Sequence, residues 1–156
     1  MPVWLWVGLA TMLFSAMHIV IDFGVGLFDL SGTLSFTETT TLVGVGLIQL
    51  WWAISFMAGA SGNGSGVASA GILGVGWAAM TNGYPIVYCP PLCQQAWPLS
   101  DLAHLGSIVF GLLLPLVAIW SLWRAGVRPG WFMPAVAAAL VLVTVVSLAN
   151  TPIMSI

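Results

Sequence analysis

The chain has 156 residues, of which 60% are hydrophobic and 4% are charged, and its mean hydropathy is +1.10. A soluble domain has about a quarter of its residues charged, so this composition predicts an integral membrane protein in contact with a lipid bilayer. Two arginines are the only permanent cations, and lysine is absent. These counts exclude a nucleic-acid-binding surface, which needs many phosphate contacts, and a lysine Schiff base.

Five apolar segments are long enough to cross a bilayer. A helix needs about 20 apolar residues to cross about 30 Å of hydrocarbon. Glycine, proline and polar clusters divide the chain into segments near residues 3–22, 36–60, 67–84, 101–123 and 131–149. The third is rich in glycine and alanine and is the least hydrophobic, so four spans are an alternative. We expect one all-α domain over residues 1–156, a polytopic bundle of transmembrane helices.

Both arginines, Arg124 and Arg128, lie in one short predicted loop. Short loops rich in arginine and lysine stay in the cytoplasm. With five spans, the N-terminus and the turn at residues 59–66 are then also cytoplasmic. The segments 23–35 and 85–100 and the C-terminus are extracytoplasmic, in a bacterial-type inner membrane or a plasma membrane.

The two cysteines, Cys89 and Cys93, fall in the sequence "YCPPLC" of the second extracytoplasmic segment. Disulfides persist in such compartments. Three residues separate the cysteines, two of them prolines, so the spacing differs from the CxxC motif of thiol–disulfide exchange. We expect a structural disulfide; free thiols and a redox or metal-binding role are the alternatives.

Small residues recur every four positions along the third segment, at Gly66, Ala70, Gly74 and Ala78. Such a ridge lets the backbones of neighbouring transmembrane helices approach closely. The pattern predicts that this helix lies at the centre of the bundle.

Five tryptophans lie near the predicted inner boundary of the membrane. Tryptophans at such positions form a belt at the lipid headgroups. We expect this role for Trp4, Trp6, Trp120, Trp123 and Trp131.

Two pairs of ionisable residues interrupt the apolar segments. His18 and Asp22 are four apart in the first span, and Asp101 and His104 are three apart at the start of the fourth. Each spacing places both residues on one helix face. Because the two spans run in opposite directions, both pairs lie within about two turns of the outer boundary. Ionisable residues inside a membrane usually face the bundle interior, where they pair with one another or mark a pathway for ions or substrates.

Four interpretations of this His/Asp cluster are open. Two imidazoles and two carboxylates are a complete donor set for tetrahedral zinc and suit similar divalent metals. A histidine could instead ligate a noncovalent haem or chlorophyll, since no CxxCH motif is present. The cluster could form a proton site or bind an organic ligand. Finally, each pair could simply make a local His–Asp hydrogen bond.

Two classes of function fit these features. The first is a noncatalytic membrane subunit that packs into a larger membrane complex and stabilises it, which the near absence of a soluble part favours. The alternative is a small transporter or ligand-binding protein that forms a homo-oligomer. Its site would be His18, Asp22, Asp101 and His104. An enzyme is the least expected, because its acid–base groups would have to be these same four residues.

Overall fold

The structure is a computed structural model that describes the backbone of residues 2–24, 36–83 and 99–150. Side chains at positions 21–24, 37, 38, 82, 83 and 99–101 lie outside the described set. Within these ranges every regular element is a helix, which confirms the all-α class. The helices are α1 (Val3–Gly24), α2 (Phe36–Ala60), α3 (Gly64–Gly83), α5 (Leu99–Ala125) and α6 (Phe132–Asn150).

Four of the helices are long and apolar enough to cross a membrane. The qualifying segments are Val3–Val20, Thr39–Ala60, Leu102–Ala125 and Phe132–Asn150. Their length and composition indicate an integral membrane protein built as a helical bundle. The helix α3 does not qualify, in line with the low hydropathy of its sequence.

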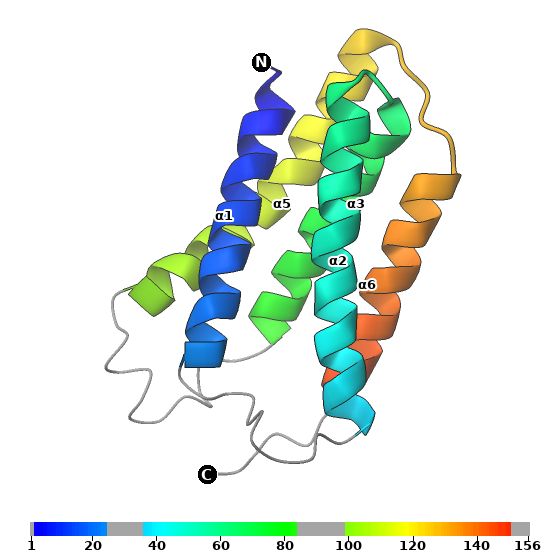
Figure 1. Cartoon of the computed structure of the whole chain (residues 1–156). Helices are drawn as coiled ribbons and strands as arrows, with labels where there is room; N and C mark the ends of the chain where they lie inside the picture. The colour runs from blue at the N-terminus through cyan, green and yellow to red at the C-terminus, as the bar shows by residue number, and fades with distance from the viewer. Residues whose placement is uncertain (1, 25–35, 84–98, 151–156) are drawn as a thin grey trace.

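Consecutive helices run in opposite directions along one bundle axis (Figure 1). The N-terminus of α1, the turn between α2 and α3, and the α5–α6 connection lie at one end, which we call the arginine end because it carries Arg124 and Arg128. The other end holds the C-terminal turns of α1 and the first turns of α2 and α5. We call it the acidic end, because Asp22, Glu38 and Asp101 occupy those turns.

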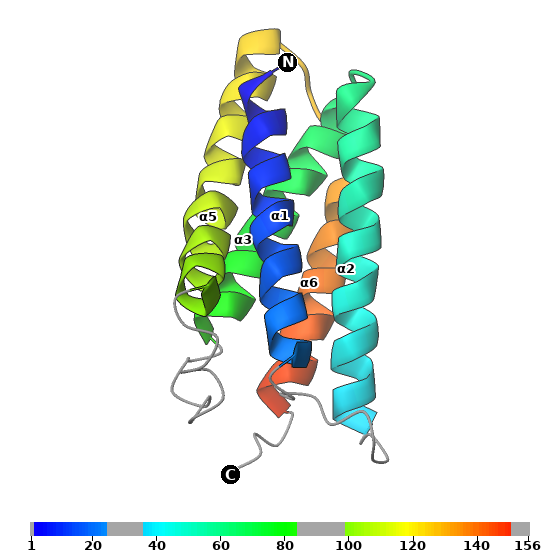
Figure 2. The same cartoon turned by 60° about the vertical axis from the view of Figure 1, so that its left-hand side comes forward.

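The helix α3 lies at the centre of the bundle. It packs mainly against α5, α6 and α2, with fewer contacts to α1, and lies behind α1 in the view of Figure 2. Its small residues allow this. A Cβ atom added at Gly74 would lie 2.9 Å from the carbonyl oxygen of Gly111, and one at Gly66 would lie 2.5 Å from that of Ser55. Ala70 and the remaining ridge residue, Ala78, are fully or almost fully buried.

The helix α3 begins at Gly64, earlier than the predicted residue 67. Asn63 explains the difference, because its side-chain Oδ1 accepts a hydrogen bond of 2.9 Å from the Ser65 amide. This is an N-cap, for which asparagine is among the preferred residues. The tight turn before it uses Gly62 at a φ of +93°, a conformation that glycine adopts without steric cost.

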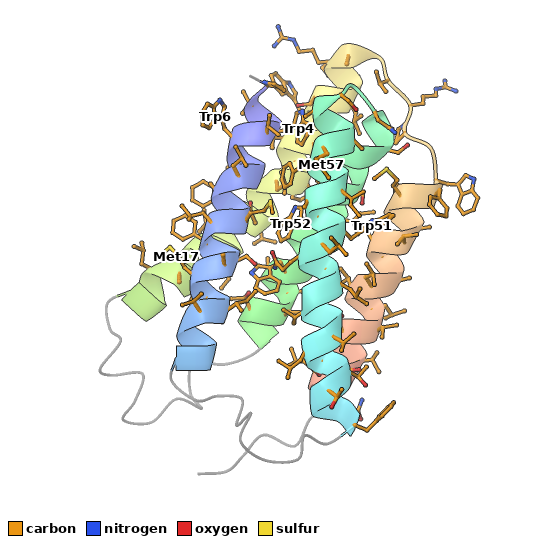
Figure 3. The ribbon with its side chains drawn as sticks, viewed as in Figure 1. Trp4, Trp6, Met17, Trp51, Trp52 and Met57 are labelled. Atoms are coloured by element: carbon orange, nitrogen blue, oxygen red, sulfur yellow. The ribbon has the colours of Figure 1, made fainter. Side chains whose placement is uncertain are left out.

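Four of the five belt tryptophans are exposed, as predicted: Trp6, Trp120, Trp123 and Trp131. Figure 3 shows Trp6 pointing away from the bundle, whereas Trp4 lies inside it. The prediction for Trp4 is wrong: its side chain is buried and stacks on Phe56, with ring centroids 5.7 Å apart. The reason is Gly59 of α2, where a Cβ atom would lie 2.6 Å from the Trp4 ring.

Candidate functional site at the histidine pair

The structure brings the two histidines of the chain together. The ring centroids of His18 in α1 and His104 in α5 lie 5.6 Å apart, with 32° between the ring planes. Each ring is half-buried. The contact follows from the antiparallel packing of α1 on α5, since His18 lies in the last turns of α1 and His104 in the first turns of α5. Figures 1 and 2 both show these two helices side by side.

A third helix covers the histidine pair. The buried indole ring of Trp77 in α3 meets the His18 ring nearly edge-on, with centroids 6.4 Å apart and an interplanar angle of 84°. The pair therefore has α3 beside it as well as the two helices that carry it, α1 and α5. An apolar cover of this kind limits water access to a bound ion and strengthens its electrostatic interactions.

Polar side chains continue from the histidines into the bundle. Ser15, one turn before His18, accepts a 2.7 Å hydrogen bond from the Gln49 side-chain amide of α2. Ser107, one turn after His104, is fully buried. Neither its hydroxyl nor the indole N–H of Trp77 has a hydrogen-bond partner among the described residues. Unsatisfied polar groups are costly at membrane depth, so this part of the interior is suited to a polar ligand.

The carboxylate residues of the cluster sit on the acidic-end side of the histidines. Asp22 follows His18 by one turn of α1, and Asp101 precedes His104 by about one turn of α5. Their backbones are described, but their side chains lie outside the described set. Among the side chains that are described, no three histidine, cysteine, aspartate or glutamate residues gather in a group. Cys89 and Cys93 also lie outside the described residues, so their disulfide stays a prediction.

The spacing of the two imidazoles suits one shared ion. A metal holds imidazole nitrogens at about 2.0–2.1 Å. Two imidazoles bound to the same metal with a tetrahedral or somewhat wider nitrogen–metal–nitrogen angle therefore have ring centroids roughly 5–6 Å apart. The separation of 5.6 Å lies in that range.

The packing of α1 on α5 disfavours a macrocycle between the two histidines. One turn deeper in the bundle, Phe14 stacks on Phe110 with ring centroids 5.4 Å apart and planes at 12°. Phe14 also packs over Gly106, where a Cβ atom would collide with its ring. A haem or chlorophyll held by both histidines would have to separate these contacts, whereas a single ion would not.

Sequence reasoning missed the rest of this site. Trp77 has no spacing relationship to the His/Asp pairs that would assign it to the site, because its position depends on how α3 is rotated about its axis. Ser107 follows His104 by three residues and shares its helix face, but nothing in the sequence shows that this face is buried. The polarity of Ser107 inside an apolar span was the one available signal.

Comparisons of this chain with protein-family models, with curated proteins and with solved structures found no match.

Proposed function

We propose that the protein is an integral membrane protein that binds one divalent transition metal ion between α1 and α5. The observation that carries this proposal is the 5.6 Å separation of the His18 and His104 rings, which come from distant parts of the sequence and are its only imidazoles. A local His–Asp hydrogen bond in each helix does not require the two histidines to meet. A shared ligand does.

In this proposal Asp22 and Asp101 complete the coordination sphere. Two neutral imidazoles and two carboxylates form a common donor set for zinc and related metals. A divalent ion with two carboxylates is also electrically neutral. The metal would thereby offset the cost of keeping two acidic residues close to hydrocarbon, where single charges are expensive.

We further propose that all five helices cross the membrane, with the arginine end in the cytoplasm. The low hydropathy of α3 is compatible with this, because α2, α5 and α6 shield much of its surface from lipid. The bias of arginine toward one end supports the orientation. The metal site would then lie toward the outer face.

Metal titration of the purified full-length protein tests the site. The protein is stripped with chelator in mild detergent and titrated with Zn²⁺ by calorimetry, and with Co²⁺ by visible absorption, which reports the coordination geometry. We expect one metal per chain and a tetrahedral Co²⁺ spectrum. His18→Ala and His104→Ala should each weaken binding by more than the roughly 10- to 100-fold typical of losing an outer-shell partner.

Gln49→Leu is the matched control, because it also removes a polar side chain of the bundle interior but no proposed ligand. It should bind metal like the wild type. Each variant is checked for helix content and a monodisperse elution profile. Wild-type protein that binds neither metal, or histidine variants that bind as the wild type does, would contradict the proposal.

A noncatalytic subunit of a larger membrane complex is the second candidate. It is favoured by the short connections at the arginine end, residues 61–63 and 126–131, which leave no extramembrane domain there in the described part of the chain. The size and composition of the particle in mild detergent separate the candidates. Foreign subunits in fixed stoichiometry with a metal-free chain support the second; a metal-loaded monomer or homo-oligomer supports the first.

A further inference from the structure

A groove with only apolar residues in its lining runs along α3 between α5 and α6. Its volume is about 610 Å³. Val75, Ile119 and Leu142 line it, one from each helix, and all three are substantially exposed at 43%, 65% and 64%. The groove is therefore open to whatever surrounds the bundle. We call it the α3 groove.

The α3 groove runs along the middle of α3 and reaches the arginine end. Along α3 it extends from Ala68 to Ala79. At 1.5 Å per residue this is about 16 Å, roughly half of the 30 Å hydrocarbon thickness. Ala68 and Ala79 each lie four residues from an end of α3, and Pro129 extends the lining to the arginine end. The lining therefore offers apolar surface from the arginine end to past the middle of the bundle, which is long enough for one acyl chain.

Positive charge lies at the headgroup end of the α3 groove. Pro129 is part of its lining, and the preceding residue is the exposed Arg128. The connection that carries them is fixed to α3, because the Gly130 amide donates a 2.7 Å hydrogen bond to the Ser65 hydroxyl. Helices α3 and α6 also begin here, and helix N-termini favour anions.

The other arginine, Arg124, lies at a different pocket. The Arg124 guanidinium lies 5.3 Å from the centroid of the Trp120 ring. Both residues border a separate pocket of about 310 Å³, which Pro2 and Val3 of the α1 end complete. Both arginines are exposed and positively charged, but only Arg128 adjoins a residue that lines the α3 groove.

We propose that the α3 groove binds an anionic phospholipid, with one acyl chain along α3 and the headgroup phosphate at Arg128. The apolar lining accounts for the acyl chain, and the arginine accounts for the anionic headgroup. Basic sites between transmembrane helices bind anionic lipid headgroups in this way. The site is independent of the histidine pair, which lies toward the acidic end.

Lipid-dependent thermal stability tests this proposal. The full-length protein in a neutral detergent is supplemented with phosphatidylglycerol or with phosphatidylcholine of the same chains, and the unfolding midpoint is measured. A ligand that binds the folded state raises the midpoint. We expect a larger rise with phosphatidylglycerol. Arg128→Gln should remove this difference, and Arg124→Gln should keep it.

A second pair of variants tests the acyl-chain part of the α3 groove. Ala138→Phe places a ring in the groove, whereas the neighbouring Ala139 is equally exposed but is not part of the lining. Native mass spectrometry should show bound phosphatidylglycerol on the wild type and on Ala139→Phe, and at least tenfold less on Ala138→Phe.

Three outcomes would overturn the proposal. Equal stabilisation by the two lipids would remove the headgroup preference. If Arg124→Gln and Arg128→Gln both lost the larger stabilisation by phosphatidylglycerol to the same extent, general surface charge would explain the effect. Release of a bound protein subunit by Ala138→Phe, with lipid content unchanged, would show that a partner helix occupies the groove. None of these depends on metal binding at His18 and His104.

Discussion

Single glycines set the distance between α3 and α5. At Gly74 a Cβ atom would lie 2.9 Å from the Gly111 carbonyl oxygen, and at Gly111 one would lie 2.8 Å from the Gly74 carbonyl oxygen. These obstacles are backbone atoms, which cannot rotate away as a side chain can. Contacts of this kind drive helix association in membranes, where the surrounding lipid is as apolar as the helices.

We therefore expect Gly74→Ala and Gly111→Ala to destabilise the bundle. The added methyl groups force α3 and α5 apart, and overpacking of this kind costs about 1–3 kcal/mol. The free energy of unfolding, measured in mixed micelles with increasing SDS, should fall by that amount for each variant.

Gly46→Ala is the control for this prediction, because Gly46 is also inside a helix but has no atom within 4 Å of its added Cβ. Alanine is the better helix former, so stability should be unchanged or rise by up to about 1 kcal/mol. If all three variants behaved alike, close backbone packing would not be what holds α3 against α5.

At the scale of helices, the sequence was sufficient to predict the five helices found in the described parts of the chain. Hydropathy and length identify α1, α2, α5 and α6, and the glycine and alanine ridge of α3 predicts a central helix. The start of α3 and the burial of Trp4 were not predictable in this way. The first depends on a local cap at Asn63, and the second on space left by Gly59 in another helix.

For the candidate site, the sequence predicted the level in the bundle but not the geometry. Opposite chain directions place His18 and His104 at one level of the bundle, and this level follows from the sequence. That the two rings are 5.6 Å apart, with Trp77 beside them, depends on helix neighbours and rotations. The apolar segments show no strong amphipathic pattern that would fix those rotations, because most of their faces are apolar.

A small hydrogen-bond network joins α2, α3 and α6 and leads to a second prediction. The hydroxyl groups of Ser55 and Ser69 are 2.8 Å apart, and the Trp51 indole N–H donates to Ser69 at 3.2 Å and to the Met133 carbonyl oxygen at 3.4 Å. Figure 3 shows Trp51 directed from α2 toward α6. Hydrogen bonds between membrane helices contribute about 0.6 kcal/mol on average and at most about 1.7 kcal/mol.

Ser69→Ala should therefore lower the free energy of unfolding by about 0.5–1.5 kcal/mol. The exposed Ser61→Ala, which removes a hydrogen bond only within its own turn, should change it by less. A double-mutant cycle of Ser55→Ala and Ser69→Ala isolates their interaction. Strictly additive effects of the two substitutions would mean that this contact does not couple α2 to α3.

Over the whole molecule, charge is divided between the two ends of the bundle. Both arginines occupy the arginine end, and three of the four acidic residues lie in helix turns at the acidic end. Anchoring aromatic residues are also present at the arginine end, where Trp123 and Trp131 are exposed. This asymmetry supports the proposed orientation, because basic short loops are usually retained in the cytoplasm.

Cysteine labelling in intact cells tests the orientation and the number of spans together. The variants Ser61→Cys, Ala125→Cys and Asn150→Cys are each made in a Cys89→Ser/Cys93→Ser background, and all three positions are exposed. With five spans and the arginine end inside, an impermeant maleimide should label only Asn150→Cys. Permeabilised cells should show labelling of all three, which controls for reactivity.

The four-span alternative gives a different pattern. If α3 did not cross, the turn at Ser61 and the connection after Ala125 would face opposite sides, so one of these cysteines would react in intact cells and the other would not. Labelling of both from outside, with Asn150→Cys protected, would keep five spans but reverse the orientation. Because each topology gives its own combination of reactive positions, these three cysteines distinguish the proposed arrangement from both alternatives.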